Sequence, residues 1–76
     1  MKAEIYSKPN CPSCDRAKAL LTKLDIPYEE IDAVANIDIL KERVTNITGA
    51  PPRTVPQIFL DGKYIGGFTD LEKILT

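Results

Sequence analysis

Apolar residues fall along this chain in short blocks separated by turn-forming residues. Four blocks are short and bounded by turn residues, and they predict strands at residues 2–7, 28–32, 57–60 and 63–65. Three blocks are longer and carry apolar residues three or four apart, and they predict helices at residues 12–24, 37–48 and 68–75. The order predicts an α/β fold, βαβαββα, in which three helices flank a four-stranded mixed sheet.

The helical spacing also predicts which side chains turn inward. The expected inner faces are Ala17, Leu20, Leu21 and Leu24 in the first helix, Ile37, Leu40, Val44 and Ile47 in the second, and Leu71, Ile74 and Leu75 in the third. Cys14 shares the first of these faces, so it should point toward the core. Cys11 lies before the helix and should occupy an exposed tip.

Turn and cap residues fix where the elements join. Asn36 suits the N-cap of the second helix and Gly49 its C-terminal stop. Asp61-Gly62 supplies the positive φ angles of a tight hairpin between the third and fourth strands. The first helix is long enough to join two parallel strands in a βαβ unit.

Composition bounds the class of protein. A chain of 76 residues is expected to form one domain over residues 1–76, with 43% apolar and 28% charged residues. The net charge of −1 gives no reason to expect nucleic acid or an anionic membrane as partner. No apolar run is long enough to span a bilayer, and the N-terminal residues lack a signal-peptide core. A cytoplasmic, reducing location is therefore expected, where paired cysteines are more often catalytic or metal-binding than structural.

The two cysteines of the chain form the motif Cys11-Pro12-Ser13-Cys14, at the junction of a predicted strand and a helix N-terminus. The free N–H groups and dipole of that terminus favour a thiolate on Cys11, and the thiolate is the nucleophile in disulfide exchange. Pro12 suits the first helical position, and Lys8 adds a nearby positive charge.

Two other roles for the cysteines are less favoured. A structural disulfide between them would close too short a loop to stabilise the fold much. Structural zinc usually takes four Cys or His ligands, and this chain has no histidine and no third cysteine.

Two further segments have an ordinary structural interpretation when taken alone and a functional one when they accompany a redox motif. In Thr54-Val55-Pro56, a proline at a strand entrance is expected on structural grounds alone. With a cis bond before Pro56, the Val55 backbone would instead turn outward and offer a pairing edge to an extended peptide. In Gly66-Gly67-Phe68-Thr69-Asp70, Thr69 or Asp70 is expected to cap a helix whose free N–H groups would bind a carboxylate.

These segments, in this order, resemble the glutaredoxin family over essentially the whole chain. Lys8 to Cys14 is similar to its active-site turn, Thr54 to Pro56 to its cis-proline segment, and Gly66 to Asp70 to its glutathione-binding turn. The resemblance implies a thioredoxin-like fold and a glutathione-dependent reduction of protein disulfides and glutathione mixed disulfides. A thioredoxin is the weaker match, because the chain has no tryptophan and hence no Trp-Cys-Gly-Pro-Cys sequence.

By the resemblance, Cys11 is the nucleophile, Cys14 the resolving thiol, and glutathione the co-substrate, with no metal expected. Glutathione would meet Lys8, Pro12, Ser13, Arg53, Thr54, Val55, Pro56, Gly67, Thr69 and Asp70. In that set Lys8 faces the glycine carboxylate, the Val55 backbone the cysteinyl unit, and Thr69 with Asp70 the γ-glutamyl end. The role of Arg53 is open between a ligand contact and a solvated loop charge. Expected partners are disulfide-containing proteins, ribonucleotide reductase among them by resemblance only, and the chain is expected to be a monomer.

The chain departs from the family pattern at Ser13, where many dithiol members carry tyrosine, and in the proline-rich loop at residues 50–53. A different class stays open, an iron–sulfur cluster carrier in which two subunits share a cluster through the first cysteine and glutathione. A small residue at position 13 favours that alternative, and the stiff Pro12 disfavours it.

Overall fold

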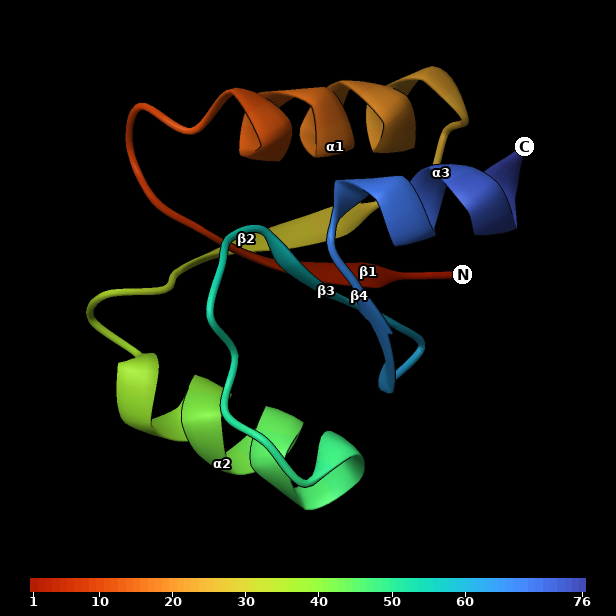
Figure 1. Cartoon of the computed structure of the whole chain (residues 1–76). Coiled ribbons are helices and arrows are strands. Elements are labelled where there is room, and N and C mark those ends of the chain that lie inside the picture. Colours follow the sequence, from red (N-terminus) through yellow and green to blue (C-terminus); the bar gives the residue numbers. More distant parts are fainter.

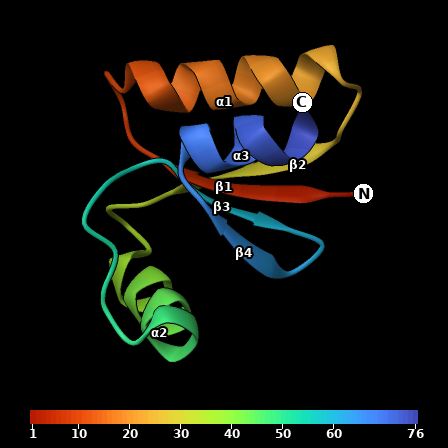
Figure 2. The ribbon, with the colours of Figure 1, turned by 45° about the vertical axis from the view of Figure 1, so that its right-hand side comes forward.

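The computed structural model describes all 76 residues, and its elements follow the predicted order. They are β1 (Ala3–Ser7), α1 (Pro12–Lys23), β2 (Tyr28–Asp32), α2 (Ile37–Thr48), β3 (Gln57–Leu60), β4 (Lys63–Gly66) and α3 (Phe68–Leu75). The sheet order is β2-β1-β3-β4. Helices α1 and α3 lie side by side on one face of the sheet and α2 lies on the other (Figures 1 and 2).

Strand β1 sits near the middle of the sheet because it pairs on both sides. It runs parallel to β2, joined through α1, and antiparallel to β3, and β3 pairs antiparallel with β4. Ile5 of β1 and its partner Ile58 of β3 are both fully buried. The predicted mixed sheet, its parallel βαβ unit and its hairpin are confirmed. The Asp61-Gly62 turn has φ angles of 49° and 81°, as its sequence predicts.

The two faces of the sheet have different cores. The α1/α3 face is aliphatic and contains Ala3, Ile5, Ala17, Leu21, Ile58, Leu60 and Leu71. The α2 face is smaller and partly aromatic, and contains Tyr6, Ala33, Leu40, Val44 and Phe59.

A cation attaches α2 to this aromatic face. The Arg43 guanidinium lies 3.7 Å from the centroid of the Phe59 ring. It donates to both carboxylate oxygens of Glu4, at 2.9 and 3.2 Å, and to the Tyr6 hydroxyl at 2.9 Å. The hydrogen bond to Glu4 raises the pKa of Arg43. Helix α2 is therefore held by stacking and a forked ion pair as well as by apolar packing.

Four predicted inward positions are wrong. Ile37 is 38% exposed because it is the first residue of α2, one turn before the buried Leu40. Leu24 is 40% exposed because α1 ends at Lys23 and Leu24 is its C-cap. Ile47 is 57% exposed because it lies on the turn of α2 beyond the anchor formed by Leu40, Arg43 and Val44. Ile74 is 57% exposed because Phe68, Leu71 and Leu75 already fill the inner stripe of the short α3.

The predicted ends of α2 are confirmed, with one difference. Asn36 is the N-cap and Gly49 ends the helix with φ of 82°. The Asn36 side chain does not cap the helix; it donates to the Asp32 carbonyl at 2.9 Å. The Asp32 carboxylate in turn accepts from the N–H groups of Val34 and Ala35. No helix is both long and apolar enough to cross a membrane.

Candidate active site

Cys11 is the N-cap of α1, and its sulfur is bonded to that of Cys14 one turn along the chain. The two Cα atoms are 5.2 Å apart. The Cys14 N–H donates to Cys11 Sγ at 3.1 Å, so the sulfur takes the place of the oxygen of an ordinary N-cap. Pro12 occupies the first helical position, where no N–H is needed. The reactive atom therefore sits at the end of the helix that favours negative charge.

The two cysteine residues differ less in exposure than the sequence indicates. Cys14 is 1% exposed and faces the core as predicted, but Cys11 is only 7% exposed, so the expectation of an exposed tip is wrong for this disulfide form. The cause is the 54–56 loop, whose Val55 carbonyl oxygen lies 3.8 Å from Cys11 Sγ. A disulfide sulfur carries no proton, so this is a packing contact here. Only a reduced Cys11 thiol can donate to that oxygen.

The loop that covers Cys11 contains the Val55–Pro56 peptide bond, which is cis. Pro56 is buried, and Val55 is half-buried against the α2-side core. The Thr54 carbonyl accepts a hydrogen bond from the Gln57 side-chain amide at 2.8 Å. The loop backbone is therefore fixed to the sheet by Gln57 of β3, and its Val55 carbonyl lies against Cys11.

A groove of about 350 Å³ runs from this loop to the start of α3. Its walls bring together Ser13, Thr54, Val55, Pro56, Gly67, Thr69 and Asp70 from the predicted set, together with Phe68. The sequence reasoning did not assign Phe68 to the site. Its place directly after a glycine pair, at a helix start, was the available signal.

Helix α3 begins at Phe68, as predicted, but its predicted cap is wrong. Its N-cap is Gly67, and Thr69 and Asp70 lie inside its first turn. Asp70 instead turns back, and its Oδ2 accepts from the Gly67 N–H at 3.1 Å. Gly66 has φ of 118°, and a Cβ there would lie 2.5 Å from Asp70 Oδ2. Only glycine at position 66 lets the Asp70 carboxylate fold back this closely.

A second groove, of about 150 Å³, lies on the other side of Thr54 and Val55. It contains the side chains of Lys8 and Arg53 and an apolar floor from Ala33, Ile37, Leu40 and Pro52. The two grooves share Thr54 and Val55, here called the shared wall. Pro12 lines neither groove and is exposed on α1. The structure therefore arranges the other predicted ligand contacts along two grooves that meet beside Cys11.

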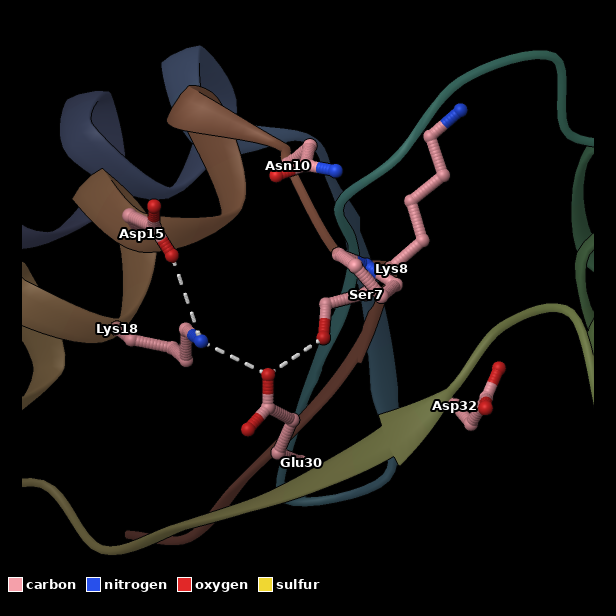
Figure 3. Close-up of a pocket in the computed structure, with 8 residues that line it drawn as sticks. Ser7, Lys8, Asn10, Asp15, Lys18, Glu30 and Asp32 are labelled. Carbon is pink, nitrogen blue, oxygen red and sulfur yellow. Dashed lines mark hydrogen bonds and ion pairs between the residues drawn. The ribbon is translucent and has the colours of Figure 1, made fainter.

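The largest pocket, about 360 Å³, lies beneath the active-site turn and contains neither cysteine. In it, Glu30 accepts from the Ser7 hydroxyl at 2.7 Å and from Lys18 Nζ at 2.8 Å (Figure 3). Lys18 also pairs with Asp15 at 3.5 Å. Hydrogen bonds from Lys18 and then Ser7 lower the pKa of Glu30, and the bond to Glu30 raises the pKa of Lys18. Lys18, Glu30 and Asp15 pair with one another and, with Ser7, tie β1, β2 and α1 together. The Lys8 side chain points away from them (Figure 3).

The geometry defines a class of protein. A cysteine pair that closes a disulfide at a helix N-terminus, against a cis-proline loop of a βαβαββα fold, is built for thiol–disulfide exchange. The structure is that of a thioredoxin-like oxidoreductase.

Comparison with known proteins narrows the class. The glutaredoxin family profile matches residues 3–65. The chain is 45% identical over 76 residues to a glutaredoxin of Haemophilus influenzae, covering 93% of this chain and 86% of that protein. The solved structure of reduced Escherichia coli glutaredoxin is similar, with a TM-score of 0.76, 40% identity, and coverage of 99% of this chain and 93% of that one. A buckwheat glutaredoxin–glutathione complex matches with a TM-score of 0.75 and 32% identity, over 93% of this chain and 64% of that chain.

This chain belongs to the glutaredoxin family. It is a glutathione-dependent thiol–disulfide oxidoreductase with a dithiol site, and glutathione is its co-substrate.

Proposed function

We propose that residues 1–76 act as one domain in which Cys11 attacks target disulfides and Cys14 resolves the product. The Cys11 thiolate attacks one sulfur of the target disulfide, forms a mixed disulfide, and releases the other sulfur as a thiolate. The Cys14 thiolate then attacks Cys11 Sγ, which frees the reduced target and leaves the Cys11–Cys14 disulfide. One glutathione thiolate opens that disulfide to give a Cys11–glutathione adduct, and a second releases oxidised glutathione. Each cycle thus moves two electrons from two glutathione molecules to one disulfide.

The observation that carries this assignment is the N-cap position of Cys11. Its sulfur accepts the Cys14 N–H at 3.1 Å at the positive end of the α1 dipole, whereas Cys14 lies inside the helix and faces the core. The same stabilisation favours the Cys11 thiolate as attacking group on the target disulfide. It also favours Cys11 as leaving group when the second glutathione attacks the glutathione sulfur of the Cys11–glutathione adduct.

We place glutathione along the two grooves, with its cysteinyl unit on the shared wall. The tripeptide has one carboxylate at its glycine end, a carboxylate and an ammonium at its γ-glutamyl end, and its thiol between them. The protein offers the same order: cations at Lys8 and Arg53, the Val55 backbone beside Cys11, then the free N–H groups of α3 and the Asp70 carboxylate. The match between the order of charged groups in glutathione and in the protein supports glutathione as the ligand and this orientation along the grooves.

The other predicted contacts take smaller roles in this arrangement. Thr54, Pro56, Gly67 and Thr69 line the groove that receives the γ-glutamyl half. Ser13 leaves that groove wider than a tyrosine would. Pro12, which lines neither groove, acts by setting the first turn of α1.

The proposed setting is a cytoplasmic monomer that reduces protein disulfides as well as glutathione mixed disulfides. Ribonucleotide reductase is proposed as one protein substrate on the family resemblance alone. The net charge of −1 gives no reason to expect nucleic acid or an anionic membrane as partner.

The test is reduction of a small glutathione mixed disulfide, coupled to glutathione reductase, beside a parallel assay supplied with thioredoxin reductase. Turnover that depends on glutathione and glutathione reductase is expected. Turnover with thioredoxin reductase alone would contradict the assignment of the electron donor.

A further inference from the structure

Gln57 is a polar residue in an apolar strand. It is 4% exposed and begins β3, whose other residues are Ile58, Phe59 and Leu60. A buried amide is tolerated only when its donors and acceptor are all used. The contacts that satisfy it therefore show what the residue does.

The amide of Gln57 links the active-site loop to the far strand. Its Nε2 donates to the Thr54 carbonyl at 2.8 Å and lies 3.5 Å from the Thr54 hydroxyl. Its Oε1 accepts from the hydroxyl of Tyr64, on β4. The Tyr64 ring is fixed in turn against Phe59, with ring centroids 5.3 Å apart.

Tyr64 brings this set of contacts near the other end of the groove. Tyr64 lies two residues before Gly66, where the chain leaves β4 for the turn that carries Gly67 and Asp70. Burial, and then the negative charge of Asp70, raise the pKa of Tyr64, so its hydroxyl stays protonated as a donor. The link Thr54–Gln57–Tyr64 thus joins the two walls between which the γ-glutamyl half of glutathione would lie.

We propose that Gln57 and Tyr64 are positioning residues that hold the Thr54 carbonyl, and with it the Val55 backbone, in register with the Gly67–Asp70 turn. The inference rests on the glutathione site proposed above and deepens it. Neither side chain touches the ligand. An apolar residue at position 57 would suit the strand equally well, but it would leave the Thr54 carbonyl without this donor.

The decisive variant is Gln57→Glu, which keeps size and shape. When ionised, the introduced carboxylate can still accept from Tyr64 but places a negative charge against the Thr54 carbonyl. When protonated, the same carboxyl group donates to that carbonyl and restores the pattern of glutamine. Burial raises the pKa of such a carboxyl, so the change occurs within the range of an activity assay.

The measurement is KM and kcat for a glutathione mixed disulfide, taken as the ratio of variant to wild type at each pH. At about pH 8 we expect KM of Gln57→Glu to rise about tenfold with kcat within about twofold, and the KM ratio to fall toward one near about pH 5.5. Tyr64→Phe, which removes the hydroxyl that donates to Gln57, should raise KM about fivefold at every pH. Tyr28→Phe, on the opposite edge strand, is the matched control and should leave KM unchanged.

The outcomes separate the two hypotheses. A KM ratio near one at all pH values, or a loss in kcat and thermal stability without pH-dependent recovery of KM, overturns the positioning role while an active wild type leaves the proposed function intact. A wild-type protein that does not turn over the mixed disulfide overturns the proposed function, and this inference falls with it.

Discussion

Helices α1 and α3 begin at the same end of the molecule (Figure 2), but their N-termini are built in different ways. The N-cap of α1 is Cys11, whose sulfur accepts the Cys14 N–H, and Pro12 removes one further donor. The N-cap of α3 is Gly67, which has no side chain, and Asp70 turns back only as far as the Gly67 N–H. At the N-terminus of α1, a backbone N–H is therefore bonded to the reactive sulfur, and we call this the closed terminus. At the N-terminus of α3, the first backbone N–H groups have no side-chain acceptor, and we call this the open terminus.

The difference shows how one physical device serves two purposes. Both termini concentrate partial positive charge. Where a side chain fills the cap, that charge acts on a covalent group of the protein and favours its thiolate. Where glycine leaves the cap empty, the same charge is available to an anion from outside. The N-cap residue decides which of the two occurs.

The largest effect that tests this comparison is expected for Cys11→Ser. Serine is a good N-cap, so α1 and the fold should be retained. Its hydroxyl is not a nucleophile for disulfides, so turnover should fall to the uncatalysed background in the glutathione reductase assay. Near-normal activity would show that the reactive atom is not at the closed terminus.

Cys14→Ser should affect the reduction of protein disulfides much more than the reduction of glutathione mixed disulfides. Reduction of small glutathione mixed disulfides should persist, because a second glutathione can resolve the Cys11 adduct. Reduction of a protein disulfide should fall sharply, since external glutathione cannot match the effective concentration of a thiol one turn away. The trapped enzyme–substrate adduct is measured on non-reducing gels.

The result that contradicts this division is an equal loss on both substrates. In that case Cys14 would be needed for the reactivity of Cys11 itself. Equal retention would show that glutathione performs all resolution.

Asp70→Ala tests the open terminus. We expect KM for the glutathione mixed disulfide to rise about tenfold, because the lost contact with the ammonium is charge-assisted. Loss of the bond to the Gly67 N–H should also destabilise the fold by ~1 kcal/mol. Thermal unfolding measured beside the kinetics separates the two effects.

Asp70→Asn is the matched control, since its amide oxygen can still accept from Gly67 but carries no charge. It should keep the thermal stability of the wild type and show the raised KM of Asp70→Ala. A normal KM in Asp70→Asn would mean that Asp70 acts only as a helix cap.

The smallest effect concerns the ion pair between Lys18 of α1 and Glu30 of β2. Lys18→Met removes the partner of Glu30, and a small fall in Tm is expected at neutral pH because the pair is solvent-exposed. The folded pKa of Glu30 is lowered from 4.5, so its stabilising effect is present above that pH and is lost as pH falls through the folded value. The folded pKa of Lys18 is raised from 10.5, so its effect is present below that pH and is lost as pH rises through the folded value. Melting curves of the two proteins should therefore converge in acid, and a constant difference would assign the effect to packing of the Lys18 stem.

The parts of the fold that sequence predicts are those set by neighbouring residues. Gly49 and Asp61-Gly62 act through their own φ angles, and the βαβ unit follows from the length of its helix. The predicted burial of Ile47 and Ile74 is wrong because exposure depends on where a helix crosses its sheet, which helical spacing does not contain.

Contacts between distant residues leave no comparable signal. Arg43 meets Glu4 and Tyr6 across 39 and 37 positions of the chain. Motifs predict the polar residues and the 54–56 backbone along both grooves, but neither Phe68 nor the apolar floor from Ala33, Ile37, Leu40 and Pro52. How these residues divide between the two grooves depends on the path of the 50–56 loop past Cys11. The polar link from Thr54 to Tyr64 escapes sequence reasoning because alternation of apolar residues marks Gln57 only as an irregularity in a buried strand.

The shared wall has a kinetic consequence. In the proposed arrangement, the Val55 backbone edge and the Cys11 sulfur beside it bind one reactant at a time, so protein substrate and glutathione react with the enzyme alternately. Such a cycle gives parallel lines in double-reciprocal plots when the two reactants are varied together. It also makes each reactant a competitor for the enzyme form that the other requires, so the rate of protein reduction should pass through a maximum as glutathione concentration rises.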